Sequence, residues 1–349
     1  MTGRRRLVGW YIHHQGAGHT SRFEAVRRQL DADVVVFSSA RRPAVLPPDT
    51  EWVELTRDDE VETADAAPLD PAEAEPDAGG LLHWAPLGHR GHARRLATVA
   101  QALAQRTFDA FVVDVSVEVT MLVRLLGVRA VVFAQPGRRG DRPHQLAYAA
   151  AERVVAPWPE RLYRPDWLAA ADDRVRFTGG ISRFDGLPRT ARRECDSVVL
   201  MMGAGGSSVT AADIDLAVAS TPGTNWRMLG SARPEPAAGH PLWHDDPFEA
   251  LSSAETVVAW AGLGSVADLA AVDAAAVVIA QGRPFGEQEA TAQVLAAAGL
   301  AVTHPAWPAR AEWPQLLDRA RELQPDWSQW RVEGAARRAA DAIAEVAAS

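Results

Sequence analysis

The chain has 349 residues, of which 47% are hydrophobic and 23% charged, and this composition is typical of a folded globular protein with room for two domains. Its formal net charge of −9 argues against a general nucleic-acid binder, because phosphate backbones are bound by clustered positive charge. The sequence contains no lysine, which excludes Schiff-base chemistry and a P-loop, and its one cysteine, Cys195, excludes an internal disulfide and a cysteine-rich metal site.

The N-terminus carries three arginines followed by LVGWYIHHQG, a stretch too short and too polar for a secretory signal peptide. No apolar run approaches the roughly 20 residues that a membrane-spanning helix needs. We therefore expect a cytoplasmic protein. Arg4, Arg5 and Arg6 favour at most a peripheral membrane contact, because three positive charges form a weak anchor.

The first half of the chain alternates between predicted strands and helices. Strands are predicted at 7–12, 34–39, 51–55, 108–114 and 128–137, and helices at 20–30, 92–106 and 117–126. Residues 56–80 are acidic, rich in alanine and proline and without an apolar period, so they predict a long loop. The alternation favours a parallel sheet with helices on both faces.

The second half repeats this pattern. Strands are predicted at 197–208, 225–231, 256–265 and 274–280, and helices at 210–220, 287–298 and 331–349. We expect an α/β fold of two doubly wound, Rossmann-like domains with a cleft between them. The expected parts are an N-terminal domain at 1–182, a polar linker at 183–195, a C-terminal domain at 196–330 and a final helix at 331–349 that packs back on the first domain.

The first glycine-rich turn, HHQGAGHTSR at 13–22, lies between a predicted strand and a predicted helix. Gly16 and Gly18 let the backbone approach a ligand closely. At neutral pH, His19 can accept a proton from an acceptor hydroxyl, and Asp114, at the end of a strand of the same sheet, can orient its ring. The alternative is structural, a histidine at a helix start and an aspartate that caps a helix.

This turn does not match the dinucleotide-binding pattern GxGxxG. Ser21 stands where the third glycine belongs, and the strand VVVFSS ends in serines rather than in an acidic residue for a ribose. A redox enzyme of the NAD type is therefore the weakest interpretation.

A second glycine-rich turn, MGAGGSS at 202–208, opens the C-terminal half. Its backbone N–H groups and hydroxyls can hold a diphosphate, although a flexible turn at the start of a domain fits the same residues. The candidate contacts to such a diphosphate ligand are Gly203, Gly205, Gly206 and Ser207.

A third turn lies in AWAGLGSVADLAAVDAAAVVIAQGRPFGEQEATAQVLAAAGLAV at 259–302, which predicts strand, turn, helix, strand, turn and helix. Asp268, on the first turn of its first helix, can accept hydrogen bonds from a ribose diol. Glu287 and Gln288 follow the next strand and can bind sugar hydroxyls. A second phosphate cradle is predicted at Gly262, Gly264 and Ser265.

This segment resembles the donor-binding signature of GT-B glycosyltransferases, both the UDP-glycosyltransferase superfamily and the lipid-linked GlcNAc transferases of peptidoglycan synthesis. Their pattern is a G-x-x-[ST]-x-x-E block, a hydrophobic strand, a Pro-rich turn and a [DE]-Q pair before a helix, and it occurs here as GLGSVAD, VVIA, QGRPF and EQ. GAGH resembles the family's N-terminal loop, and GAGGSS the opening loop of its C-terminal domain. The resemblance covers most of the chain in the expected order.

The resemblance implies an enzyme that moves a sugar from a nucleoside-diphosphate sugar, UDP or dTDP, to a hydroxyl or similar acceptor, with inversion and without a metal or other cofactor. His19 falls at the position of the family's general base and Asp114 at that of the base's partner. Asp268 stands for the ribose-binding glutamate, and Glu287 and Gln288 match the pair that contacts the donor sugar.

Trp243 lies near the segment that packs against the nucleotide base in the family, unless it is a plain core or interdomain tryptophan. Three residues depart from the family's pattern. Asp268 is one methylene shorter than the usual glutamate, Trp260 replaces a histidine that contacts the donor phosphate, and Thr291 replaces an asparagine. Trp260 leaves phosphate binding to backbone N–H groups, and the departures together weaken the assignment of the donor to UDP.

The segment LHWAPLGHRGHARR at 82–95 is expected beside the acceptor, which is a small molecule or a lipid-linked one. Its arginines suit an anionic acceptor. Its three histidines do not predict a metal site, because no carboxylate accompanies them at ligand spacing. The candidate acceptor contacts are Gly16, Gly18, His83 and Arg90.

Two other functions stay open on the same fold. A sugar-nucleotide epimerase should carry several carboxylates around the sugar, and here only Glu287 and Asp268 stand out. A protein that binds a nucleotide sugar without catalysis fits the departures from the pattern, although His19 and Asp114 argue against it.

Overall fold

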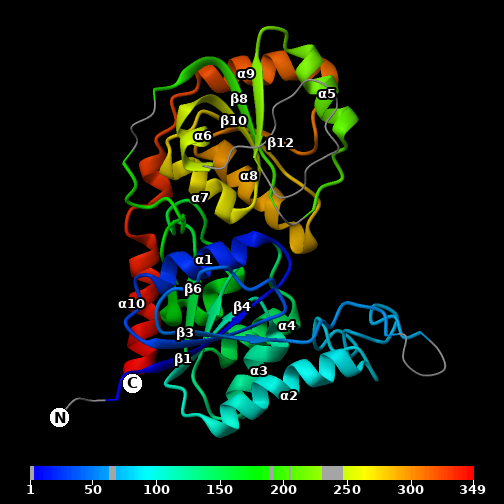
Figure 1. Ribbon diagram of the computed structural model, residues 1–349, viewed down its shortest axis with the longest axis vertical. Coiled ribbons are helices and arrows are strands. Elements are labelled where there is room, and N and C mark those ends of the chain that lie inside the picture. The colour runs from blue at the N-terminus through cyan, green and yellow to red at the C-terminus, as the bar shows by residue number, and fades with distance from the viewer. Residues whose placement is uncertain (1–3, 63–67, 189–191, 204–205, 230–246) are drawn as a thin grey trace.

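The computed structural model describes residues 4–62, 68–188, 192–203, 206–229 and 247–349, and Figure 1 shows two α/β domains stacked along its long axis. Each domain contains one sheet, and all strand pairs within the two sheets are parallel. The expected architecture of two doubly wound domains is therefore confirmed. Of the expected donor contacts, Gly205 and Trp243 lie outside the described residues.

The N-terminal sheet has seven strands in the order β3-β2-β1-β4-β5-β6-β7. The order reverses between β1 and β4, and Ile12 at the end of β1 lies opposite Asp114 at the end of β4. The loops that follow these strands therefore leave from the same edge, where parallel sheets bind ligands. The strands are β1 (Leu7–Ile12), β2 (Asp33–Ser38), β3 (Thr50–Glu54), β4 (Ala110–Asp114), β5 (Ala130–Phe133), β6 (Arg153–Ala156) and β7 (Val175–Phe177).

Helices cover both faces of this sheet, so its central strands are buried on both sides. One face packs against α1 and α10, and the other against α2, α3 and α4 (Figure 1). The bounds are α1 (Ala17–Arg27), α2 (Arg90–Gln105), α3 (Val117–Leu125), α4 (Arg142–Ala150), α10 (Ala335–Ala348) and the 3₁₀ helix η1 (Asp166–Arg174).

The C-terminal sheet has five strands in the order β12-β11-β10-β8-β9, with its reversal between β8 and β10. Its strands are β8 (Glu194–Met201), β9 (Asn225–Leu229), β10 (Ala254–Trp260), β11 (Ala276–Ile279) and β12 (Val302–His304). Its helices are α5 (Ala211–Ser220), α6 (Pro247–Ser253), α7 (Leu263–Ala271), α8 (Glu287–Ala297) and α9 (Trp313–Glu322). Short 3₁₀ helices are η2 (Pro284–Gly286), η3 (Arg310–Glu312) and η4 (Trp327–Trp330).

The final helix, α10, leaves the C-terminal domain and packs on the N-terminal sheet (Figure 1). Its alanine-rich face, including Ala339 and Ile343, joins one buried cluster with Trp10 of β1 and Val155 of β6. The guanidinium of Arg338 donates a 2.8 Å hydrogen bond to the carbonyl of Thr178. The N-terminal core is thus completed by the end of the chain.

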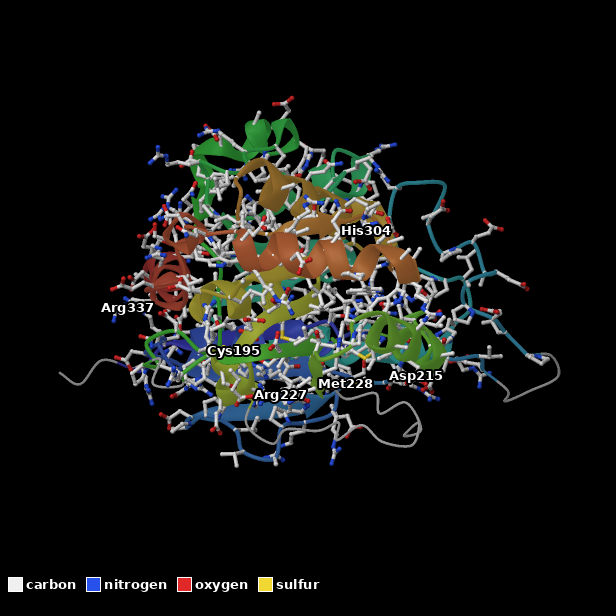
Figure 2. All side chains as sticks on the ribbon, turned by 90° about the horizontal axis from the view of Figure 1, so that it is seen from above. Cys195, Asp215, Arg227, Met228, His304 and Arg337 are labelled. Carbon is white, nitrogen blue, oxygen red and sulfur yellow. The ribbon has the colours of Figure 1, made fainter. Side chains whose placement is uncertain are left out.

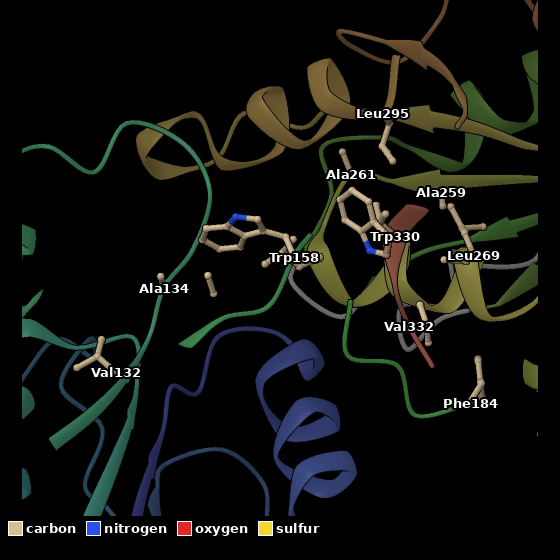
Figure 3. Packing of buried hydrophobic residues seen from close by; sticks show 14 of the residues in the cluster. Val132, Ala134, Trp158, Phe184, Ala259, Ala261, Leu269, Leu295, Trp330 and Val332 are labelled. Atoms are coloured by element: carbon tan, nitrogen blue, oxygen red, sulfur yellow. The ribbon is translucent and has the colours of Figure 1, made fainter. Parts of the chain in front are cut away.

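A second buried cluster runs through both domains (Figure 3). It contains Val132 and Trp158 from the N-terminal domain and Ala259 and Trp330 from the C-terminal part. A Cβ atom added to Gly180 would lie 2.3 Å from the Nε1 atom of Trp330, so this close approach requires glycine. The two domains therefore share a core.

The expected boundaries differ from the structure in a few places. β8 begins at Glu194, so it takes in the last two residues of the expected linker at 183–195. The described part of 56–80 contains one isolated bridge, between Glu62 and Leu69, and no helix or named strand. Cys195 is exposed on β8 (Figure 2). Among the described helices, none has the length and apolarity to cross a bilayer.

Gly9 provides a test of the packing in the N-terminal sheet. It lies opposite Phe111 in the register of β1 and β4, and an added Cβ would lie 2.2 Å from that ring, which is fully buried. We expect Gly9→Ala to lower the unfolding free energy by about 1–3 kcal/mol, because the ring has no space to move into. Gly282→Ala, where no atom lies within 4 Å of the new methyl group, is the control in urea unfolding. Equal stabilities of the two variants would contradict this packing.

Candidate active site between the two sheets

A cavity of about 830 Å³ lies between the carboxyl ends of the two sheets. The N-terminal domain lines it with segments that follow β1, β4 and β5, and the C-terminal domain with segments that follow β8, β10 and β11. This is the interdomain position that two doubly wound domains predict. The expected site residues on its wall are Gly16, Gly18, His19, His83, Gly203, Gly262, Gly264, Ser265, Glu287 and Gln288.

His19 and Asp114 form a hydrogen-bonded pair at the N-terminal wall. The Nδ1 atom of His19 lies 3.0 Å from Oδ1 of Asp114, which is fully buried behind it. His19 is on the first turn of α1 and Asp114 is the last residue of β4, so the switch point of the sheet brings them together. This geometry leaves Nε2 of His19 as the ring nitrogen without a contact to Asp114.

Arg22 is a third member of this group, although the sequence motif that contains it does not mark it as a site residue. Its Nε and Nη2 atoms donate hydrogen bonds of 3.1 and 2.7 Å to the two oxygens of Asp114. Burial by itself raises the pKa of Asp114, but the charge of Arg22, followed by that of His19, outweighs burial and brings it to about 2. The signal in the sequence is the spacing, because residues three apart on a helix share a face.

A network of polar side chains forms the neighbouring wall of the N-terminal domain. His14 contacts Asp59 at 3.0 Å through Nε2, and the buried Arg95 donates to the hydroxyl of Tyr11 at 3.0 Å. Burial, with His19 and His14 close by, lowers the pKa of His13 to about 3. Burial also raises the pKa of Tyr11 to about 12. His14, Asp59, Arg95 and Tyr11 on this wall are therefore already hydrogen-bonded to other side chains of the protein.

The opposite wall contains the start of α7. Gly262 is its N-cap, and the first N–H groups of a helix have no partner within it, so they favour an anion. A Cβ on Gly264 would lie 3.8 Å from the Cα of Gly18, which places the first and third glycine-rich turns in contact. The side-chain oxygen of Gln288 accepts a 2.9 Å hydrogen bond from the backbone N–H of Gln281.

Trp260, which stands where the resemblance expects histidine, also lines the cavity. It is 3% exposed, its ring lies 5.7 Å from that of Trp307, and its Nε1 atom has no hydrogen-bond partner among the described residues. Gly206 and Ser207 lie outside the cavity lining. The carbonyl of Gly206 accepts from Arg283 at 2.8 Å, and the hydroxyl of Ser207 accepts from a neighbouring backbone N–H.

Glu287 is held by the opposite domain. Arg139, 4% exposed, lies 3.3 Å from its Oε2 atom, and the guanidinium lies 5.0 Å from the centre of the Phe285 ring. The backbone N–H of Arg138 donates a 2.7 Å bond to the Phe285 carbonyl, and a Cβ on Gly137 would lie 2.4 Å from that oxygen. The loop before α8 is therefore fastened to the loop after β5.

Asp268 does not line the cavity, although the resemblance places it at the ribose. It is 7% exposed; its carboxylate accepts a 2.7 Å hydrogen bond from Ser182 and lies 3.2 Å from the guanidinium of Arg183. Burial raises its pKa, and those two partners oppose the rise. Asp268 therefore joins α7 to the end of the N-terminal domain and the start of the linker, because Ser182 and Arg183 contact its oxygens.

His83 belongs to a chain of polar groups with Asp141 and His144, whose nitrogen and oxygen atoms are close enough to hold a metal ion. His83 contacts Asp141 at 2.6 Å, and His144 contacts the other carboxylate oxygen through Nδ1. Arg139 donates to Nε2 of His144 at 2.9 Å, so the ring hydrogen of His144 is on Nδ1, facing Asp141. The group is therefore complete as a hydrogen-bonded chain.

Arg90 does not reach the cavity wall. It is exposed at the first position of α2, and its backbone N–H donates a 3.1 Å hydrogen bond to Glu62. His89 and His92, the other histidines of that segment, are buried under the loop at 56–62 through contacts to Glu60 and Asp58. Of the two candidate acceptor contacts in this segment, His83 lines the cavity and Arg90 does not, and His92 and Arg95 of the same segment line it as well.

The arrangement of the two sheets and the final helix defines the fold class. Two parallel α/β domains face each other through their carboxyl ends, and a helix from the end of the chain returns to the first domain. This is the architecture of the GT-B glycosyltransferases.

Solved glycosyltransferases share this architecture over the full chain. The glycotransferase of kitacinnamycin superposes with a TM-score of 0.63 at 15% identity, covering 99% of this chain and 100% of its own. MurG of Acinetobacter baumannii gives 0.63 at 15%, covering 98% and 99%. UGT89C1 of Arabidopsis thaliana, solved with UDP-L-rhamnose, gives 0.68 at 13%, covering 99% and 100%. No protein-family model and no curated protein sequence matches the chain.

Two histidines of the cavity wall, the half-buried His13 and the buried His144, predict a loss of stability in mild acid. The pKa values of His13 and His144 are lowered to about 3 and about 4 in the fold, from 6.5 in a free side chain, chiefly by burial. As the pH falls from about 6.5 to 4, the unfolded chain takes up protons at these positions and the folded chain does not. We expect the unfolding free energy to fall by up to about 1.4 kcal/mol per pH unit for each histidine.

Urea unfolding at pH 7, 6 and 5 measures this dependence. His13→Gln should flatten the loss, since one of the two groups no longer titrates, whereas His304→Gln, on β12 outside the cavity, is the control. A loss of equal size in the wild type and in His13→Gln would contradict the burial of this ring.

The position of Asp268 makes a separate prediction. Asp268→Asn should lower the unfolding free energy by about 1–2 kcal/mol, because it weakens a buried hydrogen bond and a partly exposed ion pair. It should leave the affinity for a nucleoside diphosphate unchanged, because the residue does not line the cavity. Urea unfolding checks the first part, and calorimetric titration with UDP and dTDP checks the second. A tenfold loss of affinity in the folded variant would show that Asp268 contacts the nucleotide after all.

Proposed function

We propose that the protein is a glycosyltransferase that moves a sugar from a nucleoside-diphosphate sugar to a hydroxyl acceptor, with inversion at the anomeric carbon. The observation that carries the proposal is the hydrogen-bonded pair of His19 and Asp114 across a cavity from the N-terminus of α7. When an alcohol displaces a diphosphate, one group must accept the proton of the alcohol and another must stabilise the leaving anion. The two facing walls of the cavity provide these groups.

In this reaction, His19 takes the proton of the acceptor hydroxyl at Nε2 while the oxygen attacks the anomeric carbon. Asp114 accepts the hydrogen of Nδ1, which orients the ring and stabilises the imidazolium as it forms. The carboxylate suits this role because its pKa of about 2 keeps it ionised at neutral pH. The bond from the anomeric carbon to the diphosphate breaks as the new bond to oxygen forms.

The donor lies along the C-terminal wall, with its diphosphate at the start of α7. The backbone N–H groups at Gly262, Gly264 and Ser265 stabilise the charge of the leaving diphosphate without a metal ion. The Nε1 hydrogen of Trp260 is a neutral donor on the same wall, in place of the expected histidine. Glu287 and Gln288 contact the sugar hydroxyls, and the nucleotide is UDP or dTDP.

The acceptor lies against the N-terminal wall near His83. The side chains that the N-terminal domain contributes to the cavity include six histidines, three carboxylates and Arg95, so they suit an acceptor rich in hydroxyl groups, whether it is a small molecule or the head group of a lipid. We propose that the protein works in the cytoplasm with such an acceptor.

Calorimetric titration with UDP, dTDP, GDP and NAD tests the donor site first, followed by a transfer assay. The assay measures release of the nucleoside diphosphate from UDP-glucose or dTDP-glucose in the presence of a panel of hydroxylated acceptors. His19→Gln should lower kcat by about 10²–10⁴-fold, because the general base is lost, with unchanged affinity for the nucleotide. Binding of NAD alone by the wild type, or full activity of His19→Gln, would exclude the proposal.

Glu287→Gln separates the sugar contact from the nucleotide contact. The variant should bind the sugar nucleotide about tenfold more weakly and the free nucleoside diphosphate as the wild type does, because one charged hydrogen bond to the sugar is lost. Glu289→Gln, two residues further on the same helix, is the matched control. Equal weakening of sugar nucleotide and free nucleotide would place Glu287 away from the sugar.

A further inference from the structure

Arg22 occupies an unusual place for an arginine. It is 8% exposed, its guanidinium lies 5.2 Å from the centre of the Phe133 ring, and it donates to both oxygens of the fully buried Asp114. Its Nη2 atom also lies 3.0 Å from Nδ1 of His19, the same distance that separates Nδ1 from the carboxylate. Three ionisable side chains therefore meet at one nitrogen atom.

The charges of this group balance only when the histidine ring is neutral. With a neutral His19, the positive charge of Arg22 and the negative charge of Asp114 cancel in a region closed to solvent. Without Arg22, a neutral His19 would leave Asp114 as an uncompensated buried anion. Such an anion is costly, so His19 and Asp114 would together take up one proton and restore neutrality.

We propose that Arg22 is a positioning residue that keeps the ring of His19 neutral. The one ring hydrogen is then on Nδ1, where it is donated to Asp114, and Nε2 is left to accept a proton. The role of Nε2 rests on the proposed transfer reaction. The protonation state of the ring, in contrast, is a property of the free protein and can be measured without a substrate.

The competing contact from Arg22 to Nδ1 would place the ring hydrogen on Nε2 instead. Two observations favour Asp114 as the partner. Nη2 already makes its shorter bond, of 2.7 Å, to the carboxylate, and that carboxylate accepts hydrogen bonds but cannot donate them. If the ring hydrogen is on Nδ1, Oδ1 of Asp114 accepts hydrogen bonds from both Arg22 and His19. If it is on Nε2, this oxygen loses the hydrogen bond from His19.

Other charged groups around α1 are already engaged. His13, whose ring lies 5.8 Å from that of His19, is neutral because its pKa is lowered to about 3. On α7, which packs against α1, Asp268 is held by the linker. On α10, which also packs against α1, Arg337 pairs with Asp341. Among the described residues, Arg22 and Asp114 are thus the charged groups in contact with the ring.

Nitrogen-15 NMR of the histidine rings in the free protein tests the proposal, with His19→Gln identifying the signal. We expect a neutral ring with its hydrogen on Nδ1 at pH 7 in the wild type. In Arg22→Met the midpoint of ring protonation should rise by about one pH unit or more, because a neighbouring cation is removed. Arg28→Met removes an exposed arginine just after the same helix and should change nothing.

Two further variants keep the test decisive if Arg22→Met does not fold. Arg22→Lys retains a positive charge and should keep the ring neutral at pH 7, while losing the paired contact with the carboxylate. Asp114→Asn leaves Nδ1 without a carboxylate, so the ring hydrogen should move to Nε2. A hydrogen on Nε2 in the wild type, or the same midpoint in Arg22→Met as in the wild type, would overturn the proposal.

The outcome separates this inference from the function it serves. If the NMR results are as expected and His19→Gln transfers sugar at the wild-type rate, the proposed function fails and the control of the ring by Arg22 stands. If His19→Gln is inactive and the ring state does not depend on Arg22, the base is correct and this inference fails.

Discussion

The site depends on how closely two parallel sheets can approach each other through their carboxyl ends. Two contacts between the domains hold the sheets at that distance, and in each of them one partner is a glycine. Gly137 meets the carbonyl of Phe285, and Gly180 meets the ring of Trp330, at distances that leave no space for a Cβ atom. Because of this approach, a histidine on the first domain and the start of α7 on the second share one cavity. A wider separation would leave two half-sites, each open to water.

Much of this arrangement follows from the sequence. The alternation of strands and helices predicts the two sheets, and the ends of parallel strands predict that His19 and Asp114 meet at one edge. The strands β6, β7 and β12 and the helices α4, α6 and α9 are missing from the sequence prediction. Most of them are short or polar and carry no strong period, so their packing against neighbours defines them. The exception is α9, whose buried residues Trp313, Leu316 and Ala320 recur at helical spacing and could have predicted it.

The pairing of charges is the part that the sequence does not predict. Arg22 is in the same motif as His19, but an arginine on a surface helix is ordinarily solvated, and its burial against Asp114 depends on a strand 92 residues away. Asp268 matches a family position, and yet Ser182 and Arg183 take its oxygens because the linker crosses α7 at that point. Glu287 meets Arg139 only because the domains touch. Each of these contacts joins two segments that lie far apart in the sequence. The local sequence pattern of one segment therefore says nothing about the other.

The return of α10 to the first domain has a consequence for how the protein is made. The face of the N-terminal sheet that carries Trp10 is covered by α10, a segment that follows the whole C-terminal domain in the sequence. Before α10 docks, α1 is the other described helix on that face, and a strip of apolar strand surface is open to solvent. The first domain is thus completed only when a segment beyond the second domain has packed on it, so deletion of α10 should destabilise the start of the chain.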